Sequence, residues 1–331
     1  RKTVMKLSAL ARRHFFFGVH EAIVRRPTVR CARELEATQW MSPAETRELQ
    51  RVKLAQLLHH AWERVPFYRR RFAEAGLDIH GADPLSELRR LPLLSKEDIR
   101  GAGEEMVWRA APGGLSLRST GGSTGEPLTF YLDRRRQAYD QAARMRSHRW
   151  FGVELGDCEV MLWGSPIEQS RTDRLRGIRD RLFNQHLLDA FQMSAARMDR
   201  YLDEWDRLRP TALFGYPSSI ALFVRHARTR NRSLNRARLR AVFVTGEVCY
   251  AQDRKAMEDY FGVPVADGYG SREAGFIAHQ CQHGGMHMTA ENVIVEILCD
   301  GQEAAAEEAG GGLDENDNAI VRLANQIIAD A

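Results

Sequence analysis

Apolar residues along this chain of 331 residues follow a helical spacing first and an extended spacing later. After residue 50 they recur every three or four positions, which predicts one face of a helix. These positions are Leu54, Leu57, Leu58, Ala61 and Val65. Ser42, with Pro43 and Glu45 behind it, is typical of a helix start, and Pro66 marks the end of that helix. Ser95 predicts the start of a second helix.

From about Ser116 short apolar runs alternate with helical stretches. The runs predict strands at 128–132, 159–164, 212–215, 241–245, 263–266 and 292–298. Helices are expected at 195–208, 219–230 and 252–261, with Gly262 as the stop signal of the last one. Strands that alternate with helices need crossover connections, so we expect an α/β fold with a largely parallel sheet flanked by helices.

The same pattern suggests how the chain is organised. We expect one large domain with a helical region at 1–115 and an α/β nucleotide-binding core at 116–300. Residues 301–331 begin with a stretch rich in Ala, Glu and Gly, which indicates a linker followed by a tail of no readable periodicity.

The net charge and the distribution of basic residues limit which binding partners are expected. The net charge of +4 is too slight for a nucleic-acid-binding face. Basic residues gather within 1–30, with Phe15, Phe16 and Phe17 between them. Two interpretations are open: a helix that rests on an anionic membrane surface, or, as the favoured one, a helix packed on its own domain. No apolar run approaches the ~20 residues of a membrane span. The five scattered cysteines include no CxxC pair and predict reduced thiols in a cytoplasmic protein.

The strongest chemical signal is a loop of glycines and hydroxyls, followed by a predicted strand. Glycines allow backbone amides to approach an anion, and hydroxyls add uncharged donors. The loop lacks the terminal Gly-Lys-Ser/Thr of a Walker A motif and is not a GxGxxG fingerprint. We therefore expect it to bind phosphates. Its residues are Ser119, Thr120, Gly121, Gly122, Ser123, Thr124 and Gly125.

Two further motifs follow predicted strands, where open α/β sheets place their ligands. The first is Thr245-Gly246-Glu247, which by itself also fits a plain strand-to-helix turn. The second runs from Asp267 to Glu273 as DGYGSRE. Its tyrosine offers a ring face to a base, and the Glu273 carboxylate is a suitable oxygen ligand for Mg²⁺.

The order of these motifs resembles that of the acyl-adenylate-forming superfamily, in particular its phenylacetate–CoA ligase branch. Residues 57–72 (LLHHAWERVPFYRRRF) and 91–99 (LPLLSKEDI) are also similar to that branch. The GYPS turn at 215–218 and the YGSRE form look most like its CapK-type members, which are associated with polysaccharide synthesis. The resemblance covers roughly residues 42–298 and implies the large N-terminal domain of that fold.

The resemblance implies ATP, Mg²⁺ and coenzyme A as cofactors and a small carboxylic acid as substrate. The loop at 119–125 would hold the β- and γ-phosphates, and Glu273 the metal. Glu273, Arg272 and Thr124 would be the catalytic residues, although many relatives have Ser or Thr at the position of Arg272. Adenine would be framed by Gly246, Glu247 and Tyr269. The acyl pocket would be lined by Tyr216, Pro217, Gly270 and Ser271.

Other features depart from the family. No Arg-x-Gly-Asp follows Glu296, and no lysine-bearing C-terminal domain is visible, so we expect a truncated or frameshifted member that binds ATP weakly and cannot complete thioester formation. The alternative is a non-catalytic binding or scaffold protein of a polysaccharide locus. A kinase or nucleotidyltransferase is disfavoured because the loop has no lysine.

A last cluster contains zinc-type ligands, namely His279, Cys281, His283 and His287, in a spacing that fits no standard zinc site. The favoured interpretation is a histidine-rich loop.

Overall fold

The computed structural model describes residues 11–120, 127–164, 173–234, 236–296, 298–299 and 302–303. Contacts divide the chain into two compact units. Unit 1 comprises Arg1–Glu36, Ala138–Ser271 and Gly275–Met288. Unit 2 comprises Ala37–Gln137, Arg272–Ala274 and Thr289–Ala331.

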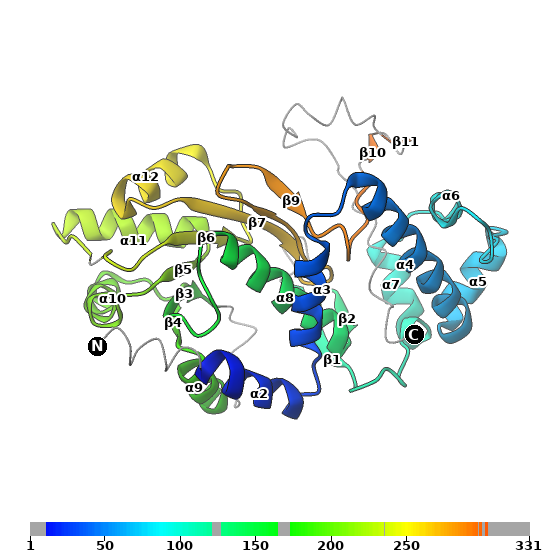
Figure 1. The fold of residues 1–331 in the computed structure, drawn as a ribbon, viewed down its shortest axis with the longest axis horizontal. Helices are drawn as coiled ribbons and strands as arrows, with labels where there is room; N and C mark the ends of the chain where they lie inside the picture. The colour runs from blue at the N-terminus through cyan, green and yellow to red at the C-terminus, as the bar shows by residue number, and fades with distance from the viewer. Residues whose placement is uncertain are drawn as a thin grey trace. The chain divides into compact units, whose positions relative to one another are not determined.

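Unit 1 is built on a seven-stranded sheet in the order β4-β3-β5-β6-β7-β8-β9 (Figure 1). Its strands are β3 (Glu159–Trp163), β4 (Gln185–Asp189), β5 (Ala212–Gly215), β6 (Ala241–Thr245), β7 (Val265–Ser271), β8 (Gly275–Gln280) and β9 (Met286–Met288). The first five strands in the sheet order are parallel, and β8 and β9 extend the sheet antiparallel. The predicted α/β fold with a mainly parallel sheet is therefore confirmed.

Both faces of this sheet are covered, which explains why its central strands are continuously apolar. On one face Leu213 and Val242 pack with Trp205 and Phe223 in a single buried cluster. That cluster draws on α10 (Ala195–Leu208), α11 (Pro217–Thr229) and α12 (Ala251–Phe261). On the other face Phe214 and Phe243 belong to a second cluster. The remaining helices of unit 1 are α2 (Phe17–Ile23), α3 (Thr28–Thr38), α9 (Asp173–Leu182) and most of α8 (Arg134–Trp150).

Unit 2 is mainly helical, with two short antiparallel strand pairs among its described residues. Its elements are α4 (Pro43–Arg64), α5 (Pro66–Glu74), α6 (Pro84–Arg89), α7 (Lys96–Ala102), the 3₁₀ turn η2 (Gly103–Met106), β1 (Ser116–Ser119) and β2 (Thr129–Leu132). A two-residue pair, β10 (Leu298–Cys299) and β11 (Gln302–Glu303), follows. The predicted helix starts at Ser42 and Ser95 are confirmed, because both residues form capping boxes.

Two predicted strands need correction. The run at 263–266 becomes β7 only from Val265, and β7 continues to Ser271 through the motif that we interpreted as a turn. The expected strand at 292–298 does not form over residues 292–296. There Gln50 donates to the carbonyl oxygens of Ala290 and Val293, and the buried Glu296 pairs with Arg89 at 2.7 Å. Side chains of unit 2 thus bind this backbone where a neighbouring strand would otherwise do so.

Candidate functional site

The predicted site residues lie on both units. Unit 2 carries Ser119, Thr120, Arg272 and Glu273. Unit 1 carries Tyr216, Pro217, Gly246, Glu247, Tyr269, Gly270 and Ser271. The centre of the glycine-hydroxyl loop lies outside the described residues, namely Gly121, Gly122, Ser123, Thr124 and Gly125.

The hairpin β1–β2 fixes both ends of the glycine-hydroxyl loop. Ser119 is paired with Thr129 in the antiparallel register. One step further, the Thr120 amide donates to the Leu128 carbonyl at 2.9 Å, and the Leu128 amide donates to the Thr120 hydroxyl at 2.9 Å. The Thr120 side chain therefore adds a further hydrogen bond to the hairpin. Ser119, Thr120 and Leu128 form the base of the loop.

Arg272 joins the DGYGSRE motif to this base. Its guanidinium donates to the Ser119 carbonyl oxygen at 3.0 Å, across 153 positions of sequence. Arg136, in the first turn of α8, binds the segment from the other side. It donates to the carbonyl oxygens of Arg272 at 2.9 Å and Glu273 at 3.0 Å. Charged donors make strong bonds of this kind, so the two arginines hold the loop base and Glu273 as one structure.

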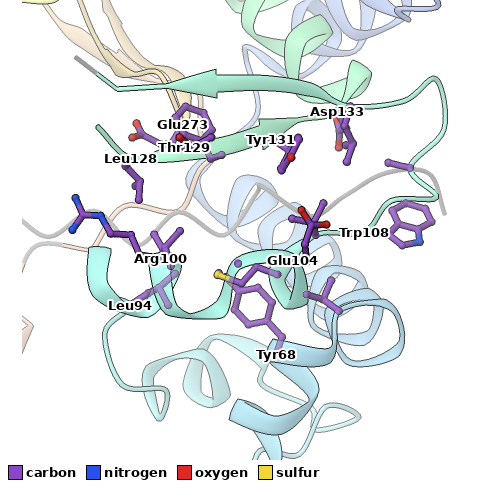
Figure 2. Close-up of a pocket in the computed structure, with 18 of the residues that line it drawn as sticks. Tyr68, Leu94, Arg100, Glu104, Trp108, Leu128, Thr129, Tyr131, Asp133 and Glu273 are labelled. Carbon is purple, nitrogen blue, oxygen red and sulfur yellow. The ribbon is translucent and has the colours of Figure 1, made fainter. Parts of the chain in front are cut away.

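Glu273 lies on the wall of a cavity of about 530 Å³ in unit 2 (Figure 2). That volume is in the range of small-molecule pockets. The wall is mostly apolar and comes from α4, α5, α7, η2 and the hairpin. Figure 2 places Glu273 beside Thr129, with Tyr68 on the opposite side and Arg100 at one end.

Two of the three carboxylates on this wall already have partners. Glu104 pairs with Arg109 at 2.9 Å, and the same guanidinium lies over the ring of Tyr131 at 4.4 Å. Asp133 accepts the backbone amide of Arg136 at 2.6 Å and so caps α8. Burial raises the pKa of Asp133, although nearby amides and arginines oppose the shift.

The third carboxylate is available. Among the described residues, nothing donates a hydrogen bond to the half-buried Glu273 side chain and no cation pairs with it. A half-buried carboxylate without a partner is unfavourable unless something else balances its charge. Its position next to the loop base therefore fits a cation ligand.

In unit 1 aromatic rings gather at the carboxyl edge of the sheet. Tyr216 follows β5, and its ring stacks on Trp163 at the end of β3, with centroids 4.1 Å apart and an interplanar angle of 13°. The Tyr216 hydroxyl donates to the Gly164 carbonyl at 3.1 Å. Phe191, after β4, meets the Tyr216 ring edge-on at 6.2 Å and is 56% exposed. This edge thus presents a flat apolar wall, as bases and aryl groups require.

Only glycine fits at position 246, next to the Tyr216 ring of this wall. Its φ of +83° is a left-handed conformation. A Cβ there would come within 3.1 Å of the Tyr216 ring. Its neighbour Glu247 accepts the Ser218 amide at 3.3 Å, close to the start of α11. This contact agrees with the capping interpretation of the motif, and it leaves the predicted role of Glu247 toward adenine as a prediction.

The DGYGSRE glycines are explained by the sheet itself. A Cβ on Gly270 would lie 2.4 Å from the Gly275 carbonyl oxygen, because β7 and β8 approach closely there. Tyr269 stands on the same strand and is 54% exposed. Its ring is thus accessible at the point where the β7–β8 register shifts.

The histidine-rich segment forms a hairpin. Cys281 and Gly284 make the turn between β8 and β9, and His279 pairs across with His287. The two rings diverge, since His279 lies against Phe276 at 4.4 Å and His287 against Trp150 at 5.5 Å. In the described part of the chain, no group of three or more His, Cys, Asp or Glu side chains is placed to hold a metal. The segment is therefore a strand–turn–strand hairpin rather than the loop that the sequence favoured.

Sequence reasoning missed several contributors to these sites. Trp163 ends a strand, and Phe191 follows one as Tyr216 does, so their position at strand ends was the available signal. Arg136 lies in a run of three arginines that gives no hint of its carbonyl partners. The cavity wall is assembled from separate helices and has no local signature.

Comparison with known proteins supports part of the resemblance. No protein family model matches the chain. Phenylacetate-coenzyme A ligase of Thermus thermophilus is 46% identical over 54 residues, which is 16% of this chain and 12% of that protein. The Escherichia coli enzyme of the same name is 39% identical over 67 residues, 20% of this chain and 15% of that protein.

Solved structures extend the likeness of the fold. An open conformation of 2-hydroxyisobutyryl-CoA ligase in complex with 2-HIB-AMP and CoA gives a TM-score of 0.64 at 21% identity. It covers 80% of this chain and 64% of the ligase. The same ligase in its thioesterification state gives a TM-score of 0.65, and the match covers 80% of this chain and 58% of the ligase. The chain thus spans less than two thirds of these ligases and shares the fold of their matched part.

Proposed function

We propose that this protein activates a small carboxylic acid with ATP to form an acyl-adenylate; in intact relatives thioester formation with coenzyme A follows. The observation that carries the proposal is the bond from Arg272 to the Ser119 carbonyl, with the available Glu273 carboxylate beside it. The short similarity to phenylacetate-coenzyme A ligases and the shared fold support the same chemistry. The finer assignment, a CapK-type protein of polysaccharide synthesis, is part of the proposal.

In this account the loop at 119–125 binds the β- and γ-phosphates through amides and hydroxyls. Glu273 would hold Mg²⁺, and its half-buried carboxylate, which has no partner among the described residues, fits that role. Bound Mg²⁺ would neutralise charge on the phosphates. Arg272 holds the base of the loop, and its positive charge would stabilise the α-phosphate.

The reaction needs little acid–base catalysis. The substrate carboxylate is already an anion at neutral pH. One of its oxygens attacks the α-phosphorus, the bond to the bridging oxygen breaks, and pyrophosphate leaves with the electron pair. The protein must align the reactants and stabilise charge, which explains a site without a catalytic histidine.

The nucleoside and the acid would use the carboxyl edge of the sheet in unit 1. Tyr269 would offer its exposed ring to adenine next to Gly246 and Glu247. Tyr216, Pro217 and the Gly270-Ser271 turn would line the acyl pocket, with Trp163 supporting the Tyr216 ring. The cavity of unit 2 is a second candidate place for the acid, favoured by its volume and its apolar wall.

ATP binding and adenylate formation are best measured separately. Calorimetry with MgATP tests the phosphate site, and mass spectrometry of the protein incubated with ATP, Mg²⁺ and a panel of acids detects the acyl-adenylate. We expect MgATP binding and an adenylate with at least one acid. Binding without an adenylate for any acid favours the non-catalytic binding protein. Transfer of the γ-phosphate to an acceptor would indicate a kinase instead.

A further inference from the structure

The described part of unit 1 begins with a helical segment that has two apolar faces. The π-helical turn η1 (Arg12–Phe16) runs directly into α2. One face is anchored, since Phe17 is 3% exposed and its ring packs edge-on against Phe183 at 5.7 Å. Glu21, one turn later, is also buried and pairs with Arg26. The contacts of this face agree with a helix packed on its own domain, which is the interpretation that the sequence favoured.

The opposite face is apolar as well, and it faces solvent. Phe15 is 63% exposed, Val19 46% and Ile23 75%. They lie at i, i+4 and i+8 and therefore form one stripe along the helix. Phe16, 41% exposed, widens the stripe and meets Phe15 ring to ring at 5.4 Å. Large exposed apolar groups are normal when scattered, but a contiguous patch marks an interaction surface.

The basic residues around this stripe indicate which kind of partner it binds. Residues 11–33 contain six arginines and a single carboxylate, Glu21, which is buried. Arg26 is paired with Glu21, and Arg30 with Glu34 at 2.9 Å. Arg25, just past the end of α2, and Arg33 are both exposed. A second copy of this surface would bring its basic residues against the same residues of the first, so self-association through it is electrostatically unfavourable.

We infer that the stripe Phe15–Phe16–Val19–Ile23 docks on an anionic lipid bilayer, with the aromatic and aliphatic side chains in the interface and the arginines among lipid phosphates. An apolar helix face combined with basic residues is the arrangement that binds such membranes. The attachment is peripheral, since among the described residues no helix is both long and apolar enough to cross a membrane. This inference is independent of the proposed reaction.

The test is co-sedimentation of the purified chain with vesicles of phosphatidylcholine alone and of phosphatidylcholine with phosphatidylglycerol in a 3:1 ratio. We expect binding to the anionic vesicles to exceed binding to the neutral ones by at least about tenfold and to weaken in high salt. The double variant Phe15→Ser/Ile23→Ser should lose about tenfold or more. Arg25→Gln/Arg33→Gln should lose the preference for anionic lipid.

The control is Trp40→Ser, because Trp40 is 84% exposed and lies outside the stripe. It should bind vesicles like the unchanged protein. Since the substituted side chains are exposed, all variants should keep the same melting temperature. Equal binding to both vesicle types, or unchanged binding of the stripe double variant, overturns the inference. So does a dimer in light scattering that the stripe variant converts to a monomer, because the stripe would then belong to a second copy.

Discussion

The Arg272 guanidinium donates a hydrogen bond to the Ser119 carbonyl oxygen at 3.0 Å. This bond connects two motifs that the sequence separates by 153 positions. Its acceptor is the last residue of β1 and the first residue of the glycine-hydroxyl loop. Arg272 therefore supports the loop base as well as bringing positive charge to it.

Replacing Arg272 by glutamine should weaken ATP binding by about tenfold, which corresponds to roughly 1.4 kcal/mol. Glutamine can still donate to a carbonyl but is shorter and uncharged. Calorimetric titration with MgATP measures the loss. The matched control is Arg69→Gln in α5, because Arg69 likewise donates to carbonyl oxygens, those of Trp62 and Glu63. Equal affinity in all three proteins would remove Arg272 from the phosphate site.

Much of the sheet was predictable because its strands are short apolar runs between clear boundaries. β5 and β6 begin and end where the sequence predicts, and α12 ends at Gly262 with a left-handed φ of 68°. Residues buried on both faces leave a continuous hydrophobic signal. β8 is also mostly buried but was not predicted, and its His279 was assigned to a histidine-rich loop.

The errors arose where distant groups decide local structure. The run at 292–296 has strand character, yet Gln50 of α4 takes the Val293 carbonyl oxygen. Gln50 and Lys53 take the carbonyl oxygens of Ala290 and Glu291 just before the run. In β7 the glycines suggested a turn, although they permit the close approach of β8 at Gly275. The cavity beside Glu273 could not be predicted from the sequence, because its wall combines separate residues between 60 and 133 with Glu273 itself.

The loop assignment predicts that Gly122→Val weakens ATP binding without unfolding the protein. A branched side chain would crowd the phosphates that the backbone amides must approach. We expect at least a tenfold rise in the dissociation constant, about 1.4 kcal/mol. Gly177→Val is the control, because open space surrounds Gly177. Unchanged ATP affinity in folded Gly122→Val would refute the assignment.

The two candidate places for the acid make different predictions. If the acid lies at the sheet edge, Tyr216→Ala should alter acid preference, because the bulk of Tyr216 restricts the pocket to modest organic acids. Val107→Trp, which fills part of the cavity in unit 2, should then leave the preference unchanged. Pyrophosphate exchange with acids from acetate to long-chain fatty acids measures both variants. The reverse pattern would place the acid in the cavity, and a preference of the unchanged protein for long-chain acids would contradict the Tyr216 pocket.

Unit 1 should lose stability in acid. Burial lowers the pKa of His279 to about 3, so the folded protein keeps this ring neutral while the unfolded chain takes up a proton below about pH 6.5. The stabilising contribution is full above that pH and declines as the pH falls toward 3, by up to about 1.4 kcal/mol per unit.

Glu159 adds to this loss at lower pH. Burial alone would raise its pKa, but Arg144 and His148 hold it at about 2. Its contribution is therefore full above about pH 4.3 and disappears toward pH 2.

The contribution of His279 is measured by urea unfolding at pH 7.5 and 5.5. His279→Phe, which cannot take up a proton, should lose less stability between these two values, by about 1 kcal/mol. An equal loss in both proteins would show that His279 is not the group responsible.

The central claim, that Glu273 holds the cation of a bound MgATP, is tested most directly by calorimetry of ATP binding with and without Mg²⁺. The unchanged protein should bind ATP more tightly when Mg²⁺ is present. Glu273→Gln, which keeps the size and removes the charge, should lose about ten- to a hundredfold of that affinity, while Glu74→Gln, a change at an exposed carboxylate of α5, should lose none. ATP binding of equal strength in the Glu273→Gln variant, or no ATP binding by the unchanged protein with Mg²⁺ present, would contradict the account.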